Sequence, residues 1–307
     1  MEVVKDVLII IISIIVISKG AMMLVDSAVR IAKNFGISEL VIGLTIVAMG
    51  TSAPEFAVTI LSSLRGMSDI SVGNIVGSNI FNLGFILGGT AIIRSISTKK
   101  QVVFRDGGFL LGGAIILTYF LWDLSLNRLE GVILFMMLLV YLAYLYWQKE
   151  PMEVIETTER YRKYDPLILA LSLAMVVLSS NFLVDSASDL ARLAGISEWV
   201  IGATIVAAGT SAPELATSIV ASLRGQHGIS VGNLIGIDIF NIFGVLGITA
   251  IIKDLPVDIG VRPNLIMLLG VVFITLVFMR SGWQISKREG VILVLFGVVR
   301  WIYSFGF

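Results

Sequence analysis

Cysteine is absent from the 307-residue chain, which excludes disulfides, thiolate metal sites and a catalytic thiol. The single histidine, His227, has no second histidine to form a metal site with. Sequence motifs of metalloproteases, serine hydrolases and P-loop nucleotide-binding proteins are missing as well. The formal net charge is zero, so no overall positive field attracts nucleic acid. We therefore expect neither an enzyme nor a nucleic-acid-binding protein, and no cofactor.

Charged residues are also scarce. They make up 14% of the chain and hydrophobic residues 57%, whereas soluble domains carry about 25% charged residues. Apolar runs long enough to cross a bilayer recur from end to end, which indicates membrane-spanning α-helices. The first run follows Lys5 and Asp6 and lacks a cleavage pattern, so we interpret it as a retained helix. The composition predicts an all-α, multi-pass protein surrounded by membrane lipids.

Ten spans are predicted from these runs. Their approximate ranges are 6–27, 39–64, 71–94, 107–125, 130–148, 166–186, 198–223, 230–252, 263–280 and 289–306. The only sizeable polar segment between them is a linker at 149–165. This linker separates a first part, residues 1–148, from a second part, residues 166–307.

The two parts are repeats of each other. A shift of 159 residues places Asp26 on Asp185 and Arg65 on Arg224, each within a longer matching stretch. Because each half has five spans, an odd number, the second half is inverted in the membrane relative to the first. Inverted repeats with interrupted helices near the bilayer midplane are typical of secondary transporters. We therefore expect two inverted five-helix repeats.

Lys and Arg are concentrated in the loops that follow the first, third, fifth, seventh and ninth spans. Cytoplasmic loops carry such an excess of positive residues. Both termini are therefore predicted to be extracytoplasmic and the linker cytoplasmic. Asp26 and Asp185 are expected to be solvated or capping residues at span ends, and His227 to lie in a surface loop.

The hexapeptide Gly-Thr-Ser-Ala-Pro-Glu occurs at 50–55 and again at 209–214. Each copy places a carboxylate, Glu55 or Glu214, inside an apolar run, which costs about 2.5–3.5 kcal/mol at the centre of a membrane helix. The proline leaves a helix carbonyl without its N–H partner. Carboxylate, hydroxyl and carbonyl oxygens within about one turn suit Ca²⁺, Na⁺ or Mg²⁺ better than Zn²⁺. The alternative is two kinked helices with protonated, hydrogen-bonded glutamates.

A second duplicated motif opens the next span of each half. The copies are Gly-Asn-Ile-Val-Gly-Ser-Asn-Ile-Phe-Asn at 73–82 and Gly-Asn-Leu-Ile-Gly-Ile-Asp-Ile-Phe-Asn at 232–241. Glycines four apart allow close approach of helix backbones. The polar residues three apart, Asn79 with Asn82 and Asp238 with Asn241, share a helix face. Hydrogen bonding between helices and lining of an ion path both stay open for them, and the ion path is favoured for Asn82 and Asn241. Asn74 and Asn233 are assigned mainly to packing.

At these residues the chain resembles the calcium/cation antiporter superfamily, specifically its prokaryotic sodium/calcium exchanger-like branch. Residues 41–93 and 200–252 match the two hallmark repeats of that family. The resemblance implies the sodium/calcium exchanger fold, in which helices 1 and 6 slide across a core of eight helices. It also implies a plasma-membrane antiporter that exchanges Na⁺ for Ca²⁺ by alternating access, with small cations as its substrates and no obligate protein partner.

The resemblance further implies which residues bind the ions. The Ca²⁺ site would consist of Glu55 and Glu214 with the carbonyls of Thr51 and Thr210. The sodium sites would use side-chain oxygens and two further carbonyls, namely Ser52, Ser211, Ser78, Asn82, Asn241 and the carbonyls of Ala48 and Ala207.

Two positions depart from the sodium/calcium exchanger pattern. Ile237 stands where a serine is usual, and Asn241 where an aspartate is frequent. Asparagine at both 82 and 241 also occurs in proton-coupled relatives, so Ca²⁺/H⁺ exchange through the same carboxylates is the alternative function. Asp238, one turn before Asn241, is a further candidate ion ligand. A cation channel is disfavoured because selectivity filters are usually rings of identical elements.

Overall fold

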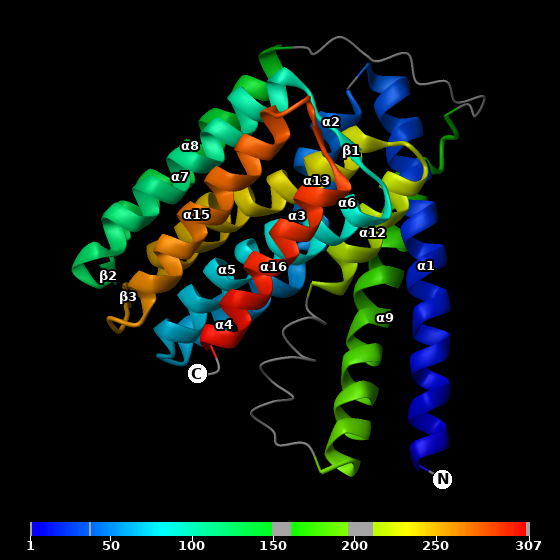
Figure 1. Ribbon diagram of the computed structural model, residues 1–307, viewed down its shortest axis with the longest axis horizontal. Helices are drawn as coiled ribbons and strands as arrows, with labels where there is room; N and C mark the ends of the chain where they lie inside the picture. Colours follow the sequence, from blue (N-terminus) through cyan, green and yellow to red (C-terminus); the bar gives the residue numbers. More distant parts are fainter. Residues whose placement is uncertain (1, 37, 149–160, 196–210, 305–307) are drawn as a thin grey trace.

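The computed structural model describes residues 2–36, 38–148, 161–195 and 211–304, and these are almost entirely helical (Figure 1). The first half contains α1 (Glu2–Phe35), α2 (Glu39–Ile42), α3 (Ala48–Thr51), α4 (Ala53–Leu64), α5 (Ser68–Phe81), α6 (Gly88–Ile93), α7 (Gly107–Phe120) and α8 (Arg128–Gln148). The second half contains α9 (Asp165–Leu193), α12 (Ala212–Leu223), α13 (His227–Ile239), α14 (Gly247–Ile252), α15 (Val261–Arg280) and α16 (Lys287–Ser304).

Shorter elements interrupt or join these helices. The π-helical segments are η1 (Gly43–Val47), η2 (Asn82–Leu87), η3 (Val102–Asp106) and η6 (Phe240–Leu246), and η4 (Leu121–Asp123) is a 3-10 turn. The strands are β1 (Ile96–Ser97), β2 (Ser125–Leu126), β3 (Leu255–Pro256) and β4 (Gln284–Ile285). π-Helical turns inside α-helices are frequent at functional sites, and η2 and η6 begin at or beside Asn82 and Asn241.

Seven helices in the described ranges are long and apolar enough to cross a membrane. A bent pair, Leu40–Thr51 with Ala53–Leu64, makes an eighth if it is one span broken by 49°. The predicted span 198–223 lies partly outside the described residues. The predicted last span corresponds to α16, which carries four charged residues: Lys287, Arg288, Glu289 and Arg300. An all-helical, multi-pass membrane protein is thus confirmed, and the count of ten spans stays a prediction.

The two hexapeptides each start a helix. Ser52 leaves the helical conformation, with φ −75° and ψ 5°, and Pro54 then sits in the first turn of α4, where its missing N–H is not needed. Ser211, with φ −94° and ψ 12°, and Pro213 do the same at the start of α12. The prolines therefore place both glutamates in the first turn of a helix.

The centre of the protein is formed by two continuous segments, α5–η2–α6 and α13–η6–α14. Of their most apolar stretches, 72% and 78% are buried within the protein, against 28% for α8 and 17% for α9. Aliphatic side chains such as Leu83, Ile86 and Leu246 are fully buried there. The remaining long helices expose much of their apolar surface, as helices facing lipid do.

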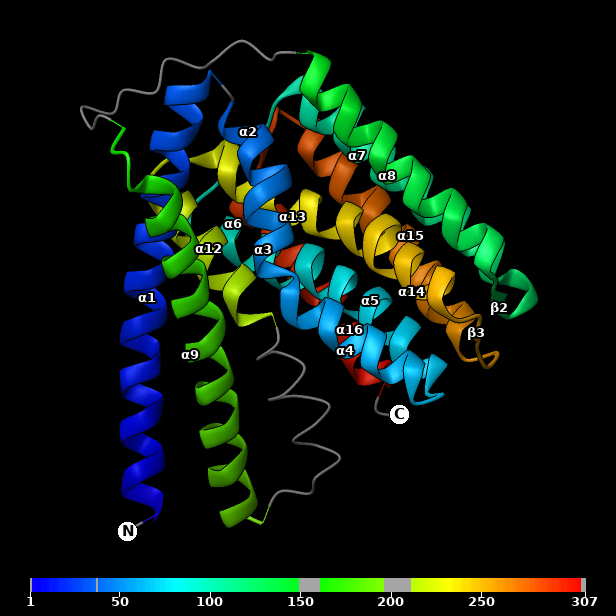
Figure 2. The ribbon, with the colours of Figure 1, turned by 180° about the vertical axis from the view of Figure 1, so that it is seen from behind.

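Helices α1 and α9 lie side by side and antiparallel, and they extend beyond the rest of the molecule (Figures 1 and 2). At one end, Arg30 of α1 donates from Nε to Oδ1 of Asp165 at 2.9 Å, and both side chains are almost fully buried. Toward the other end, α1 presents a row of exposed valine, leucine and isoleucine side chains. The ion pair therefore joins the C-terminal part of α1 to the start of α9.

Several contacts between the halves occur twice with the roles of the halves exchanged. Strand β1 pairs with β4 through Ile96 and Ile285, and β2 pairs with β3 through Leu126 and Leu255. Position 96 corresponds to 255 under the shift of 159, and 126 corresponds to 285. Helix α6 likewise packs on α16, and its counterpart α14 packs on α8. These paired contacts relate the halves by an approximate two-fold exchange.

Candidate ion-binding site

Glu55 and Glu214 are buried at the starts of α4 and α12. Their side chains are 1% and 0% exposed. Both occupy the first helical turn, where unpaired N–H groups and the positive end of the helix dipole favour a negative charge. Oε2 of Glu55 and both carboxylate oxygens of Glu214 have no hydrogen-bond partner among the described residues. Buried polar atoms are almost always paired, so these oxygens are candidates for binding a cation.

Each glutamate faces a hydroxyl from the opposite half. The Glu55 carboxylate faces Ser211, and the Glu214 carboxylate faces Thr51. Glu214 is also close enough to Glu55 and Asp238 for their charges to interact with it. The structure therefore brings together five of the residues that the sequence predicts for the site, and they come from both halves.

Polar side chains of the central segments form a hydrogen-bonded group beside the glutamates. Nδ2 of Asn82 donates to Oδ1 of Asp238 at 3.0 Å, and Nδ2 of Asn241 donates to Oδ1 of Asn79 at 2.9 Å. Nδ2 of Asn79 in turn donates to the backbone carbonyl of Asp238 at 3.2 Å. All four side chains are at most 1% exposed. The structure thus joins Asp238 to Asn82, the contact that sequence alone leaves open.

The other predicted site residues are placed less directly. Ser52 is buried, and its hydroxyl has no partner in the described part of the chain. The Ala48 carbonyl accepts from the Ser52 N–H at 3.1 Å and from the Thr51 hydroxyl at 3.3 Å. Ser78 lies on the side of α5 that faces α16, in a cavity of about 120 Å³ lined also by Arg300. The predicted ligands Thr210 and Ala207 lie outside the described residues.

Asn74 connects the two motifs of the first half. Its Nδ2 donates to the Thr59 hydroxyl at 3.1 Å and, at 3.4 Å, to the backbone carbonyl of Glu55. Asn233 makes the corresponding contact with the Ser218 hydroxyl at 3.5 Å. These bonds hold α5 against α4 and α13 against α12, in keeping with the packing role predicted for both asparagines.

Carboxylates alone do not complete an ion cage here. Within the described ranges, no group of three or more His, Asp or Glu residues lies close enough to hold a metal ion. A cation held by the two glutamates would also need hydroxyl, amide or backbone oxygens as ligands. Such a mixed set of hard oxygen donors suits Ca²⁺ and Na⁺.

Two predictions about peripheral residues were wrong. His227 is the first residue of α13 and is half-buried beside Lys99 in a cavity of about 130 Å³, rather than in a surface loop. Asp26 is not a cap, because it lies within α1; its side chain is partly exposed and forms an ion pair with Arg224 at the end of α12. Asp185, its counterpart in the other half, is exposed as predicted.

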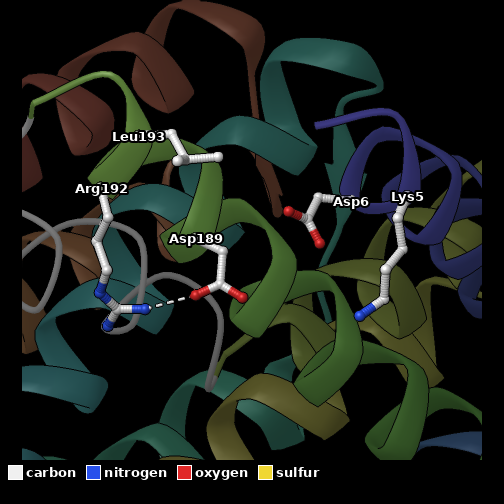
Figure 3. Close-up of a pocket in the computed structure, with 5 residues that line it drawn as sticks. All are labelled: Lys5, Asp6, Asp189, Arg192 and Leu193. Atoms are coloured by element: carbon white, nitrogen blue, oxygen red, sulfur yellow. Dashed lines mark hydrogen bonds and ion pairs between the residues drawn. The ribbon is translucent and has the colours of Figure 1, made fainter. Parts of the chain in front are cut away.

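A larger cavity lies away from the motifs, between the N-terminal end of α1 and the C-terminal end of α9 (Figure 3). Its volume is about 290 Å³. The lining residues are Lys5, Asp6, Asp189, Arg192 and Leu193, and Arg192 forms an ion pair with Asp189 at 2.7 Å. Because the opposite charges there are balanced and no motif residue takes part, this cavity is not the candidate cation site.

The structure adds to what the sequence indicated about Asn79 and places Arg300, which sequence reasoning did not single out, near the site. Asn79 contacts both Asn241 and Asp238. Its signal in the sequence is its position three residues before Asn82 and its correspondence to Asp238. Arg300 packs against the position of Gly77 from the last helix. A charge inside the apolar run of α16 was the signal for it.

The chain is similar to known proteins along most of its length. The profile of the sodium/calcium exchanger protein family matches residues 5–147 and 164–305. The chain is 37% identical to the putative antiporter CaxA of Alkalimonas amylolytica, over 88% of this chain and 89% of that protein. It is 32% identical to the sodium/calcium exchanger MaX1 of Methanosarcina acetivorans, over 95% and 96% of the two chains.

The fold also matches solved structures. The sodium-calcium exchanger NCX_Mj superposes with a TM-score of 0.85 at 29% identity, covering 97% of this chain and 98% of that one. The match extends over both halves and both motif pairs. The predicted resemblance is therefore confirmed, and the chain belongs to the sodium/calcium exchanger family, whose members are transporters and not enzymes.

Proposed function

We propose that this protein is a secondary antiporter that exchanges Na⁺ for Ca²⁺ across the plasma membrane by alternating access. The observation that carries the proposal is the pair of buried glutamates, Glu55 and Glu214, with three carboxylate oxygens that have no partner in the described residues. Two carboxylates neutralise one Ca²⁺ ion. The similarity to MaX1, a sodium/calcium exchanger, along almost the whole chain supports the same substrates.

Exchange follows from competition for one set of oxygens. Buried carboxylates without counter-ions are expensive to enclose in a membrane protein. The site can therefore be occluded only when Ca²⁺ or monovalent cations neutralise Glu55 and Glu214. Since the ions share these ligands, they bind alternately, and each crossing of Ca²⁺ is coupled to a return crossing of the other cation.

One specific observation favours a second candidate, Ca²⁺/H⁺ exchange. Ile237 is 1% exposed and occupies the position of Ser78 in the other half, so an apolar side chain replaces a hydroxyl oxygen. Asn241 is neutral where an aspartate is frequent in the family. Fewer oxygens for Na⁺ would leave the same carboxylates to exchange Ca²⁺ for protons.

The membrane arrangement belongs to the same proposal. Residues 1–148 and 166–307 form two inverted five-helix halves joined by the cytoplasmic segment 149–165, with ten spans and both termini extracytoplasmic. The paired contacts of the halves, β1 with β4 and β2 with β3, support this arrangement.

Uptake of ⁴⁵Ca²⁺ by proteoliposomes tests the coupling ion. Vesicles are loaded with Na⁺ or with choline, while the membrane potential and the pH gradient are clamped separately. We expect uptake that requires internal Na⁺ and is indifferent to the pH gradient. Uptake driven only by a pH gradient would establish the proton-coupled alternative, and no gradient-driven uptake would refute antiport.

A further inference from the structure

The side chains of two buried asparagines, Asn82 and Asn241, are held so that their amide oxygens have no partner among the described residues. Asn82 and Asn241 each donate Nδ2 to a neighbour from the opposite half. Oδ1 of each is buried and has no hydrogen-bond partner in the described part of the chain. Each amide therefore has its nitrogen engaged in a hydrogen bond and its buried oxygen without a partner among the described residues.

The direction of each amide is fixed by a backbone carbonyl, which can only accept hydrogen bonds, and by a carboxylate, which in its ionised form can only accept them. The Asp238 carboxylate lies opposite the Asn82 amide, so the NH₂ of Asn82 must point toward it. The Asp238 backbone carbonyl receives Nδ2 of Asn79, which turns Oδ1 of Asn79 toward Asn241. Asn241 must then present its NH₂ to that oxygen. Both amides are thus oriented by a chain of contacts that ends on Asp238.

The same arrangement occurs in both halves. Asn82 corresponds to Asn241 and Asn79 corresponds to Asp238 under the shift of 159 residues. The bond from Asn82 to Asp238 is therefore the two-fold counterpart of the bond from Asn241 to Asn79. A packing contact between helices does not require both amides to leave the oxygen, and not the NH₂, without a partner. A cation site does, because cations bind oxygen atoms and are repelled by N–H groups.

We infer that Asn79 and Asp238 are positioning residues of the ion site, which orient Asn241 and Asn82 so that each presents Oδ1, and not NH₂, to the transported cation. The inference rests on the proposed function, because it concerns the same site. Asp238 acts here through its ability to accept a hydrogen bond. A carboxamide at 238 retains an acceptor oxygen, so the positioning does not depend on the charge of Asp238.

Substitution of Asn79 with a rescue variant tests this role. Asn79→Leu keeps the branching of the side chain but removes the acceptor for Asn241. We expect its affinity for ⁴⁵Ca²⁺, measured on purified protein in detergent, to fall about tenfold, the effect of losing roughly one buried hydrogen bond. Asn241→Asp makes both terminal atoms oxygens, so its side chain needs no orientation. The double variant Asn79→Leu/Asn241→Asp should therefore bind Ca²⁺ as tightly as Asn241→Asp alone.

The outcomes separate positioning from structural damage. Wild-type affinity for Ca²⁺ in Asn79→Leu would overturn the inference. So would an equal loss of affinity when Asn79→Leu is introduced into the wild type and into the Asn241→Asp variant. A matched pair of variants tests Asp238 in the same way. Asp238→Asn should retain most of the affinity for Ca²⁺, and Asp238→Leu should lose it. Equal loss in these two variants would assign Asp238 to charge rather than to positioning.

Glu55→Gln distinguishes this inference from the proposed function. If the proposed function fails, Glu55→Gln binds ⁴⁵Ca²⁺ like the wild type. The effects of the asparagine variants then do not concern a transport site. If only the inference fails, Glu55→Gln loses ⁴⁵Ca²⁺ binding while Asn79→Leu keeps it.

Discussion

At the scale of single residues, Ile237 is a position where the second half lacks an oxygen that the first half has. It is buried in α13, and its counterpart Ser78 carries a hydroxyl. Threonine and valine have nearly the same shape, so the pair Ile237→Thr and Ile237→Val isolates the effect of one hydroxyl group. We expect Ile237→Thr to require a several-fold lower Na⁺ concentration for half-maximal Ca²⁺ uptake than Ile237→Val, about the worth of one hydrogen-bonding oxygen.

The measurement is Na⁺-dependent ⁴⁵Ca²⁺ uptake at fixed membrane potential. If the two variants respond to Na⁺ alike, the residue at 237 does not contribute to a sodium site, and the repeat correspondence with Ser78 has no functional meaning.

The individual site residues were predictable to different degrees. Glu55 and Glu214 could be found because a duplicated carboxylate in an apolar run is costly and so needs a reason. The role of Asn79 could not, because its partners Asn241 and Asp238 are about 160 residues away in the sequence. Which helix face meets which across the two halves depends on packing, and periodicity within one helix carries no information about that.

At the scale of elements, glycines set how closely the helices of the two halves approach. A Cβ atom on Gly88 of α6 would lie 2.8 Å from the carbonyl oxygen of Gly290 in α16. Gly131 of α8 and Gly247 of α14 make the counterpart contact, with a Cβ on Gly131 at 2.8 Å from the Gly247 carbonyl oxygen. Gly89, the neighbour of Gly88, has open space around the position of a Cβ.

Gly88→Ala and Gly89→Ala therefore form a matched pair of variants. We expect Gly88→Ala to lower the free energy of unfolding by about 2 kcal/mol because the backbones must separate. Gly89→Ala should leave it unchanged or raise it by up to about 1 kcal/mol, as alanine favours the helix. Thermal unfolding of the purified proteins in detergent measures both, and similar melting temperatures for the two variants would contradict the close helix contact.

The length of a helix could be predicted where it is set by the thickness of the membrane. It could not be predicted where it is set by packing against another helix. The first span was expected to end near residue 27, where Asp26 and Arg30 interrupt the apolar run. Helix α1 instead continues to Phe35, because Ala28, Val29 and Ala32 are buried in the protein. The GxxxG prediction is confirmed in the second half, where a Cβ on Gly236 would lie 2.6 Å from the Leu44 backbone. In the first half, Gly77 faces the Arg300 side chain.

At the scale of the whole molecule, some contacts of one half have no counterpart in the other half among the residues that this structure describes. Asp26 of α1 forms an ion pair with Arg224 at the end of α12. The corresponding residues with the halves exchanged, Asp185 and Arg65, are both exposed and do not form the equivalent pair. Helix α1 also packs on α12, whereas α9 makes far less contact with α4. An alternating-access protein with inverted halves is expected to exchange such contacts as it changes its open side.

We therefore expect the ion pair between Asp185 and Arg65 to form in the opposite access state. Because the chain has no cysteine, the double variant Arg65→Cys/Asp185→Cys contains only the two introduced thiols. A short bifunctional thiol reagent should cross-link this pair during turnover, and the cross-link should block ⁴⁵Ca²⁺ uptake. Asp26→Cys/Arg224→Cys serves as the matched pair. If that second pair reacts and Arg65→Cys/Asp185→Cys does not, the halves do not exchange these contacts.

The central claim is that Glu55 and Glu214 bind the transported ion, and the most direct measurement is ⁴⁵Ca²⁺ uptake by proteoliposomes containing Glu55→Gln or Glu214→Gln. Glu130 provides the control, because it is also a duplicated glutamate but caps a helix, accepting from the Asn127 N–H at 2.9 Å. We expect Glu130→Gln to transport like the wild type and both central variants to show no uptake while unfolding at unchanged temperature. Wild-type uptake by either Glu55→Gln or Glu214→Gln would contradict the account.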